Sequence, residues 1–164
     1  MNYENNNITF EKNDIKFNFR VAGIAVDRGR VLLHTTADDD FWNLPGGRVE
    51  FNEATEDTLI REFYEELGVR IEINKLVYVN EDFFDYSGKK YHEIGFYYVI
   101  RLPEGQEIVN QKGEFKGIED NGRLIFKWFA FEELKDMQIY PECLKTELSM
   151  IEEMKFTKHS IVRN

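Results

Sequence analysis

Acidic side chains crowd one short segment of the chain, from Gly46 to Val69. Seven acids stand there against two bases: Glu50, Glu53, Glu56, Asp57, Glu62, Glu65 and Glu66 against Arg48 and Arg61. The segment therefore carries a net charge of −5, half of the −10 of the whole chain. Carboxylates gathered in this way could bind a metal ion or accept a proton during hydrolysis.

The spacing of three glutamates places them together if the segment is helical. Glu62 precedes Glu65 by three residues and Glu66 by four, so all three lie on one helical face with Cβ atoms about 5–6 Å apart. Like charges at this spacing destabilise an exposed helix. Oxygen ligands of this kind suit Mg²⁺ or Mn²⁺, which bridge readily to substrate phosphates. The Gly46–Gly47 pair just before the segment allows the backbone to approach a ligand closely.

The competing interpretation is a solvated acidic face on an ordinary surface helix. Two features disfavour it: the glutamates lie toward the C-terminal half, where the helix dipole opposes negative charge, and Arg61 stands among them as a counter-charge. A thiolate or imidazole metal site is not indicated. Cys143 is the single cysteine, and the three histidines show no ligand spacing: His34, His92 and His159.

Length and composition predict one globular domain. The chain has 164 residues, of which 42% are hydrophobic and 15% aromatic. We expect a polar N-terminal arm over residues 1–14 and a single domain over 15–164. The negative charge disfavours DNA binding. No run reaches the roughly 18 apolar residues that span a bilayer, and the N-terminus lacks a secretory pattern. We therefore expect a cytoplasmic protein that does not bind membranes.

Hydrophobic periodicity predicts the elements that must position the acids. Leu59, Ile60, Phe63 and Leu67 indicate a helix over 54–67, with Gly68 just past its end and Asn52 or Glu53 as its cap. We expect strands at 16–26, 31–35, 71–80, 90–101 and 124–131, a turn at 27–30, a long loop at 102–123, and helices near 131–137 and 141–154. This order predicts an α+β or layered α/β/α domain with a mixed sheet.

The acidic segment resembles the signature box of the Nudix hydrolases. The pattern runs Gly47-x5-Glu53-x7-Arg61-Glu62-Phe63-Tyr64-Glu65-Glu66-Leu67-Gly68-Val69, and every defining position of the box is filled. The lead-in from Trp42 to Gly47 is also typical of that family. The resemblance implies a Nudix-type α/β/α sandwich with a mixed sheet, and hydrolysis of a diphosphate bond in a nucleoside diphosphate linked to another group.

The resemblance also implies roles for residues of the box. Glu62, Glu65 and Glu66 inherit the role of ligands to Mg²⁺ or Mn²⁺, joined by the backbone carbonyl of Gly46. Arg61 corresponds to the arginine that orients the catalytic glutamates. The supporting positions are Glu53 and Gly47.

The residue that accepts the proton of the attacking water stays open. Glu62 and Glu65 are candidates within the helix, and Glu93 and the Glu119–Asp120 pair are candidates outside it. Alternation in the strand puts Glu93, Gly95 and Tyr97 on one face, and Gly95 would leave space for a ligand beside Glu93. An ordinary polar residue on a half-exposed strand is the competing interpretation of Glu93.

Three residues near the box are candidates for contact with the substrate: Arg48, Trp42 and Tyr97. Aromatic rings can stack on a nucleobase, although they more often fill cores.

Two other functions compete with a small-nucleotide hydrolase. A Nudix-fold module that binds nucleotides without turnover is disfavoured, because a pure binder has no need of mutually repelling glutamates. An RNA 5′-end pyrophosphohydrolase is disfavoured by the charge of −10 and the lack of a basic stripe. Nudix proteins are frequently dimers, so a homodimer is among the expectations.

Overall fold

Strands dominate the computed structural model, which describes residues 6–164. The strands are β1 (Thr9–Lys12), β2 (Ile15–Asp27), β3 (Arg30–Thr35), β4 (Trp42–Asn43), β5 (Gly46–Arg48), β6 (Glu72–Tyr86), β7 (Lys89–Arg101), β8 (Phe115–Lys116), β9 (Ile125–Ala130), β10 (Ile139–Tyr140) and β11 (Lys158–Arg163). The α-helices are α1 (Thr55–Leu67) and α2 (Leu144–Glu147), and the 3₁₀ helices are η1 (Glu107–Asn110), η2 (Glu119–Asn121), η3 (Phe131–Asp136) and η4 (Leu148–Glu153). No helix of the described residues is long and apolar enough to cross a membrane.

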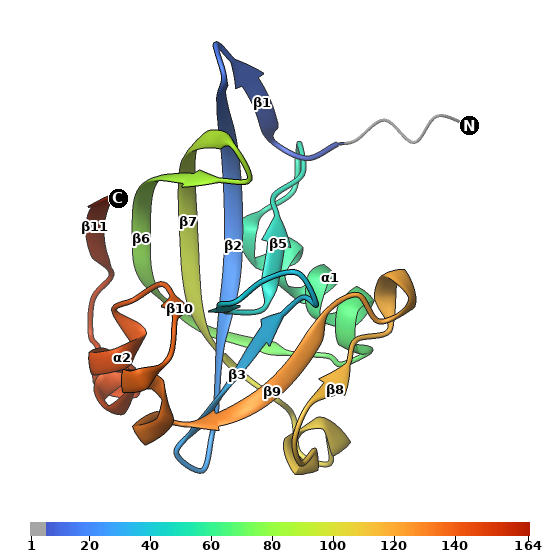
Figure 1. Cartoon of the computed structure of the whole chain (residues 1–164). Helices are drawn as coiled ribbons and strands as arrows, with labels where there is room; N and C mark the ends of the chain where they lie inside the picture. Colours follow the sequence, from blue (N-terminus) through green and yellow to red (C-terminus); the bar gives the residue numbers. More distant parts are fainter. Residues whose placement is uncertain (1–5) are drawn as a thin grey trace.

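Strand β2 is the centre of a mixed sheet. Along its length it pairs with β7 in parallel and with β1, β3 and β5 in antiparallel fashion. The main path of the sheet runs β10-β4-β3-β2-β7-β6-β11, and β6 and β7 form a long antiparallel hairpin (Figure 1). The mixed sheet with few helices confirms the expected α+β fold class.

Two apolar clusters lie on opposite faces of β2. One contains Val21 and Ala25 with Leu59 and Phe63 of α1, and the other contains Ala22 and Ile24 with the C-terminal Leu148 and Ile151. Successive residues of a strand face opposite sides, so one strand contributes to both clusters. The α1 helix covers one face of β2, and α2 with η4 covers the other.

The chain between β2 and β3 and the helix α1 match the sequence predictions. Arg28 and Gly29 have φ of 48° and 72°, as a two-residue hairpin turn requires. The helix begins at Thr55 and ends at Leu67, and Gly68, with φ of 68°, donates its N–H to the carbonyl of Tyr64. The predicted cap at Asn52 or Glu53 is wrong: Ala54 holds that position without a side-chain hydrogen bond.

The two ends of the chain contain more strand than predicted. Residues 9–12, which were expected within the polar arm, form β1. An Asn13–Asp14 turn with positive φ follows β1 and lets it pair with β2, and the rings of Phe10 and Phe17 stack with their centroids 5.0 Å apart. Residues 1–5 of that arm lie outside the described residues. Strand β11 pairs in parallel with β6 and was not predicted. Its short, mixed sequence acquires strand structure from its partner rather than from its own pattern.

The C-terminal half differs from the prediction in its helices. A helix over 141–154 was expected, but the segment divides into the four-residue α2 and the 3₁₀ helix η4. The predicted apolar stripe is nevertheless buried: Leu144, Leu148 and Ile151 are at most 3% exposed. So short a segment has little helical stability of its own, and packing decides its geometry. The predicted loop at 102–123 contains η1, β8 and η2.

The contact between α1 and β2 gives a stability prediction. Phe63 is fully buried, and its ring packs directly against Gly23 of β2. A Cβ at Gly23 would be only 2.8 Å from Phe63 Cε2. We expect Phe63→Ala to lower the free energy of unfolding by about 3–5 kcal/mol, because the cavity would face a glycine. Urea denaturation measures this. Tyr64→Ala, at a neighbouring side chain that is 57% exposed, should change it by at most about 1 kcal/mol, and equal losses would contradict the prediction.

Candidate active site

Arg61 of α1 holds three carboxylates together. Its Nε and Nη2 donate to the two oxygens of Glu53 at 2.9 and 3.0 Å. Its Nη1 donates to Glu62 Oε1 at 2.9 Å and to Glu65 Oε2 at 3.1 Å. One guanidinium thus offsets part of the repulsion among the glutamates and fixes the positions of two of them.

Glu53 connects the loop before α1 to the helix itself. Besides the paired bonds from Arg61, it accepts a hydrogen bond from the hydroxyl of Thr58 at 2.7 Å. The Arg61 hydrogen bonds are the main cause that lowers the pKa of Glu53 to about 2. Because the carboxylate of Glu53 is bound by side chains one and two turns into the helix, it does not cap the first turn. The predicted supporting position therefore has a definite partner in Arg61.

Strand β5 brings the two glycines against α1. Val21 and Ala22 of β2 pair with Gly47 and Gly46, and the Glu62 carboxylate lies directly over Gly47. A Cβ on Gly47 would be 2.1 Å from Glu62 Cδ, so any other residue at this position would displace the Glu62 carboxylate. Burial raises the pKa of Glu62 in this close contact. The structure thus brings Gly46, Gly47 and Glu62 together.

Glu66 is the most buried carboxylate of the cluster. It is 5% exposed, and its Oε2 atom is buried without a hydrogen-bond partner. Burial, and after it the charge of Glu62, raises the pKa of Glu66 to about 8. An unpaired buried oxygen is costly unless a ligand satisfies it.

The 3₁₀ helix η2 lies beside the C-terminal half of α1. The N–H of Ile118 donates to the carbonyl of Glu66 at 2.8 Å, and this contact holds the start of η2. The charge of Glu119 is among the causes that raise the pKa of both Glu62 and Glu66. Of the sequence candidates outside the helix, Glu119 is therefore brought to the cluster.

The donor set fits a divalent cation. Glu62 and Glu65 each give one oxygen to Arg61, which leaves their second oxygens and the unpartnered Glu66 Oε2 for a metal ion. Among the described residues, no three His, Cys, Asp or Glu side chains already stand in a metal-binding arrangement. The glutamates would have to turn toward a bound cation, whose charge would offset the burial of Glu66 beside Glu62.

The structure does not bring Glu93 and Tyr97 to the helix. Glu93 accepts a hydrogen bond from Asn18 at 3.3 Å and lies opposite Asp82, whose pKa is raised to about 6 by burial and by Glu93. The prediction of open space at Gly95 is wrong, because the Tyr97 ring occupies it: a Cβ on Gly95 would be 2.9 Å from that ring. Tyr97 itself is 9% exposed in the core, a position that does not support contact with a substrate.

The other two residues predicted to contact the substrate, Trp42 and Arg48, precede and follow the two glycines in sequence. Trp42 is half-buried and packs edge-on against Phe129 with ring centroids 4.7 Å apart, so its ring serves the core. Arg48 is half-buried at the end of β5, opposite Arg20 of β2. Arg20 was not singled out from the sequence, because one cationic residue in a strand gives no periodic signal. His34, expected to be structural or at the surface, is 8% exposed, and burial lowers its pKa to about 3.

Residues 17–146, which are most of the chain, match the model of the NUDIX domain family. A MutT-like protein of Streptomyces ambofaciens is 44% identical over 63 residues, which are 37% of this chain and 41% of that protein. An RNA pyrophosphohydrolase of Ruthia magnifica subsp. Calyptogena magnifica is 27% identical over 139 residues, 76% of this chain and 78% of that protein. The match to the first relative thus spans less than half of its length.

Solved structures resemble the fold over almost the whole chain. A NUDIX hydrolase from Nitrosomonas europaea has a TM-score of 0.65 at 20% identity and covers 90% of this chain and 79% of that one. A UDP-X diphosphatase has a TM-score of 0.59 at 20% identity and covers 87% of this chain and 66% of that one. At these identities the likeness concerns the fold.

The Glu53–Arg61 pair predicts a pH-dependent contribution to stability. The native pKa of about 2 lies below the ordinary 4.5, so the stabilisation is complete above about pH 5 and is lost as the pH falls toward 2. We expect Glu53→Gln to lower the free energy of unfolding by about 1–2 kcal/mol at pH 7 and by less at pH 3. Urea denaturation at several pH values measures the difference.

The exposed Glu56 of the same helix supplies the matched control. Glu56→Gln should show little change at either pH. A difference between wild type and Glu53→Gln that stays constant from pH 7 to 3 would contradict the assignment.

Proposed function

The chain belongs to the NUDIX domain family, and on that premise we propose that it is a metal-dependent hydrolase of a diphosphate bond in small nucleoside diphosphate-type substrates. One observation carries the proposal: the buried, unpartnered Glu66 Oε2 beside the Arg61-bound Glu62 and Glu65. A helix selected for stability alone would not retain this group, whereas a cation site needs it.

The box residues would hold Mg²⁺ or Mn²⁺. Glu62, Glu65 and Glu66 provide carboxylate oxygens, and the carbonyl of Gly46 is the proposed backbone ligand. When bound, a divalent cation neutralises phosphate oxygens and makes a coordinated water more acidic. Arg61 keeps the Glu62 and Glu65 oxygens in place, and Glu53 in turn fixes Arg61 by two hydrogen bonds. Arg61 and Glu53 are thus positioning residues for the glutamates.

A carboxylate must accept the proton of the attacking water. Within the helix, Glu62 and Glu65 each keep one oxygen that Arg61 does not bind. Outside it, Glu119 is supported by its charge coupling to Glu62 and Glu66, whereas Glu93 hydrogen-bonds Asn18. We therefore propose Glu62, Glu65 or Glu119 as the general base and retain Glu93 as the comparison.

A substrate panel tests the function directly. The purified protein is incubated with ADP-ribose, nucleotide sugars, dinucleoside polyphosphates, nucleoside triphosphates and triphosphorylated RNA, with Mg²⁺, Mn²⁺ or EDTA. Metal-dependent release of a nucleoside monophosphate from a small substrate supports the proposal. Release of diphosphate from RNA alone would favour the activity named for the Ruthia relative. No turnover with any metal would indicate a nucleotide-binding module.

Glu66→Gln should separate activity from stability. We expect kcat to fall by about 100-fold or more, since even indirect disturbance of a metal ligand costs 10–100-fold. The melting temperature in EDTA at pH 8 should stay the same or rise, because the variant no longer buries an ionising carboxylate. Steady-state kinetics and differential scanning calorimetry measure the two effects. Glu56→Gln is the control, and strong destabilisation with retained turnover would contradict a metal-binding role.

Glu119→Gln and Glu93→Gln distinguish the base candidates outside the helix. We expect Glu119→Gln to lower kcat by about 100-fold or more, the usual range for a general base, without loss of Mn²⁺ affinity. Glu93→Gln should leave kcat close to that of the wild type. Titration calorimetry with Mn²⁺ accompanies the kinetics, and the opposite pattern would place Glu93 in the reaction. If both variants react normally, the base is Glu62 or Glu65.

A further inference from the structure

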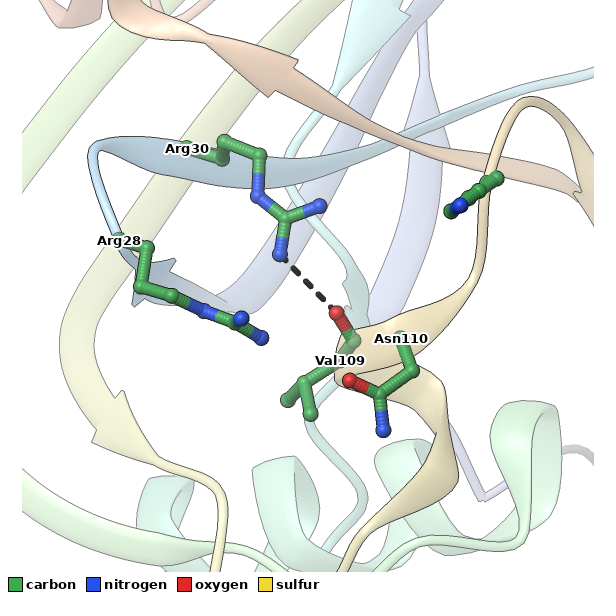
Figure 2. A pocket seen from close by; sticks show the side chains of 5 residues that line it. Arg28, Arg30, Val109 and Asn110 are labelled. Carbon is green, nitrogen blue, oxygen red and sulfur yellow. Dashed lines mark hydrogen bonds between the residues drawn. The ribbon is translucent and has the colours of Figure 1, made fainter.

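A small basic cavity lies between the β2–β3 turn and η1. Its volume is about 220 Å³, and it is lined by Arg28, Arg30, Val109, Asn110 and Lys112. Figure 2 shows the guanidinium groups of Arg28 and Arg30 directed toward Val109 of η1. The whole chain carries a net charge of −10, so three cations around one cavity are an exception to its general charge.

The protein neutralises the cations of this cavity only in part. Arg28 Nε and Arg30 Nη2 both donate to one oxygen of Asp27, at 3.0 and 2.7 Å. Lys112 forms no ion pair with any residue in the part of the chain that the structure describes. Glu107, the acid of η1, lines a different cavity. Three cations against one carboxylate leave a local charge of +2.

The protein holds Arg30 in a fixed position without a ligand. Besides its bond to Asp27, Nη2 donates to the Val109 carbonyl at 2.9 Å, and the guanidinium lies over the Trp128 ring, 5.3 Å from its centroid. Trp128 donates in turn to the Ile108 carbonyl of η1 at 2.9 Å. These hydrogen bonds use one of the three guanidinium nitrogens of Arg30. A guanidinium that is already ordered loses little conformational entropy when it binds an anion.

Arg28 occupies a turn position for which arginine is a poor choice. Its φ of 48° lies in the left-handed region, and its side chain is 68% exposed, so packing does not require it. Asn followed by Gly is the preferred pair in a two-residue hairpin turn, because Asn adopts positive φ more easily than Arg. Arg28 binds Asp27 through Nε, which leaves both terminal nitrogens for a ligand. The arginine therefore weakens the turn and adds a cation to the cavity.

The cavity is separate from the candidate active site. Ala22 of β2 pairs with Gly46, and Asp27, at the end of β2, lies five residues further along, which is about 17 Å in an extended strand. In Figure 1 the turn between β2 and β3 lies at the lower end of the molecule, below β5 and α1. A small anion in the cavity would therefore not contact a cation bound by the glutamates of α1.

We propose that this cavity binds the phosphate group of a small phosphomonoester, at a second anion site away from the glutamates. A phosphomonoester carries a charge of about −2 at pH 7 and three acceptor oxygens, which match the local charge and the guanidinium and amino donors. The cavity is smaller than the roughly 300–1,000 Å³ of sites for drug-sized ligands, so it would hold the phosphate group while the rest of the ligand stays in solvent. The inference goes beyond the proposed hydrolysis and does not depend on it.

NMR titration of the whole chain with inorganic phosphate tests the site without metal or turnover. In EDTA at constant ionic strength, we expect saturable shifts of the backbone amide signals of Gly29, Asn110 and Lys112. Arg28→Asn and Lys112→Gln should each weaken binding by about fivefold or more, because each removes a charged donor. Arg163→Gln, which removes the same charge at the exposed end of β11, should bind as the wild type does. No saturable shift in the wild type, or equal weakening in all three variants, would overturn the proposal.

Thermal unfolding of Arg28→Asn distinguishes a binding role of Arg28 from a structural one. In phosphate-free buffer this variant should melt at the same temperature as the wild type or slightly higher, because Asn suits the positive φ of the turn. A lower melting temperature together with unchanged phosphate binding would assign Arg28 to its ion pair with Asp27 and contradict its role in the site. Arg28→Lys, which keeps the charge without the guanidinium fork, should retain part of the binding.

Other anions, followed at the Gly29 and Asn110 signals, identify the chemistry of the ligand. Adenosine monophosphate should bind about as tightly as inorganic phosphate, since only the phosphate group enters the cavity. Acetate, with a single charge, should bind about fivefold more weakly or worse, and equal binding would contradict the match to a doubly charged anion. A 5′-phosphorylated oligonucleotide that binds more than about tenfold tighter than adenosine monophosphate would replace the small ligand with a polynucleotide and so overturn the proposal.

The titrations also keep this site distinct from the proposed hydrolysis. They contain EDTA and involve no turnover, so a protein that hydrolyses no substrate can still show the phosphate site. Conversely, a wild type that hydrolyses a nucleotide but gives no saturable shift at Gly29 and Asn110 would lack the phosphate site and keep the hydrolytic function.

Discussion

The four hydrogen bonds of Arg61 are the interaction on which the candidate site depends. Glu62 and Glu65 would repel each other and Glu66 on one helical face, and α1 has no basic residue in its last turn to compensate. The positive charge of Arg61, within the helix itself, offsets part of this repulsion. Arg61 is held in turn by two hydrogen bonds to Glu53, in the loop that follows β5. The glycine turn, the start of the helix and the glutamates therefore form one unit. Disturbing any of these three parts changes the geometry of the others.

Next to this satisfied network lie two groups that the protein leaves unsatisfied. Glu66 Oε2 is a buried acceptor without a donor, and Arg48 Nε is a buried donor without an acceptor. The two atoms do not pair with each other. A protein under selection for stability alone would remove both, and their retention indicates a site prepared for a ligand with complementary charges.

The sequence predicted those parts that local patterns determine. Runs rich in β-branched and aromatic residues located β2 and β3. Helical spacing with Gly68 located α1, whose Leu59 and Phe63 are buried as that spacing requires. The fixed spacing of the box located Arg61 and the glutamates. Strands β1 and β11 were missed because pairing with β2 and β6, rather than composition, makes them strands. Alternation also indicated correctly that Glu93, Gly95 and Tyr97 share a face, but it could not show that the Tyr97 ring occupies the space at Gly95. Arg20 was missed because its partner Arg48 is 28 residues away in sequence, and only the sheet register brings them together.

The two glycines explain why β5 can lie so close to both β2 and α1. A Cβ on Gly46 would be 2.1 Å from the Val21 carbonyl, and one on Gly47 would be 2.1 Å from Glu62 Cδ. Without side chains, β5 can lie against β2 on one edge and under Glu62 on one face. The next residue, Arg48, then turns to the opposite face, where Arg20 lies. A single three-residue strand thereby lies between the Glu62 carboxylate on one face and the side chains of Arg20 and Arg48 on the other.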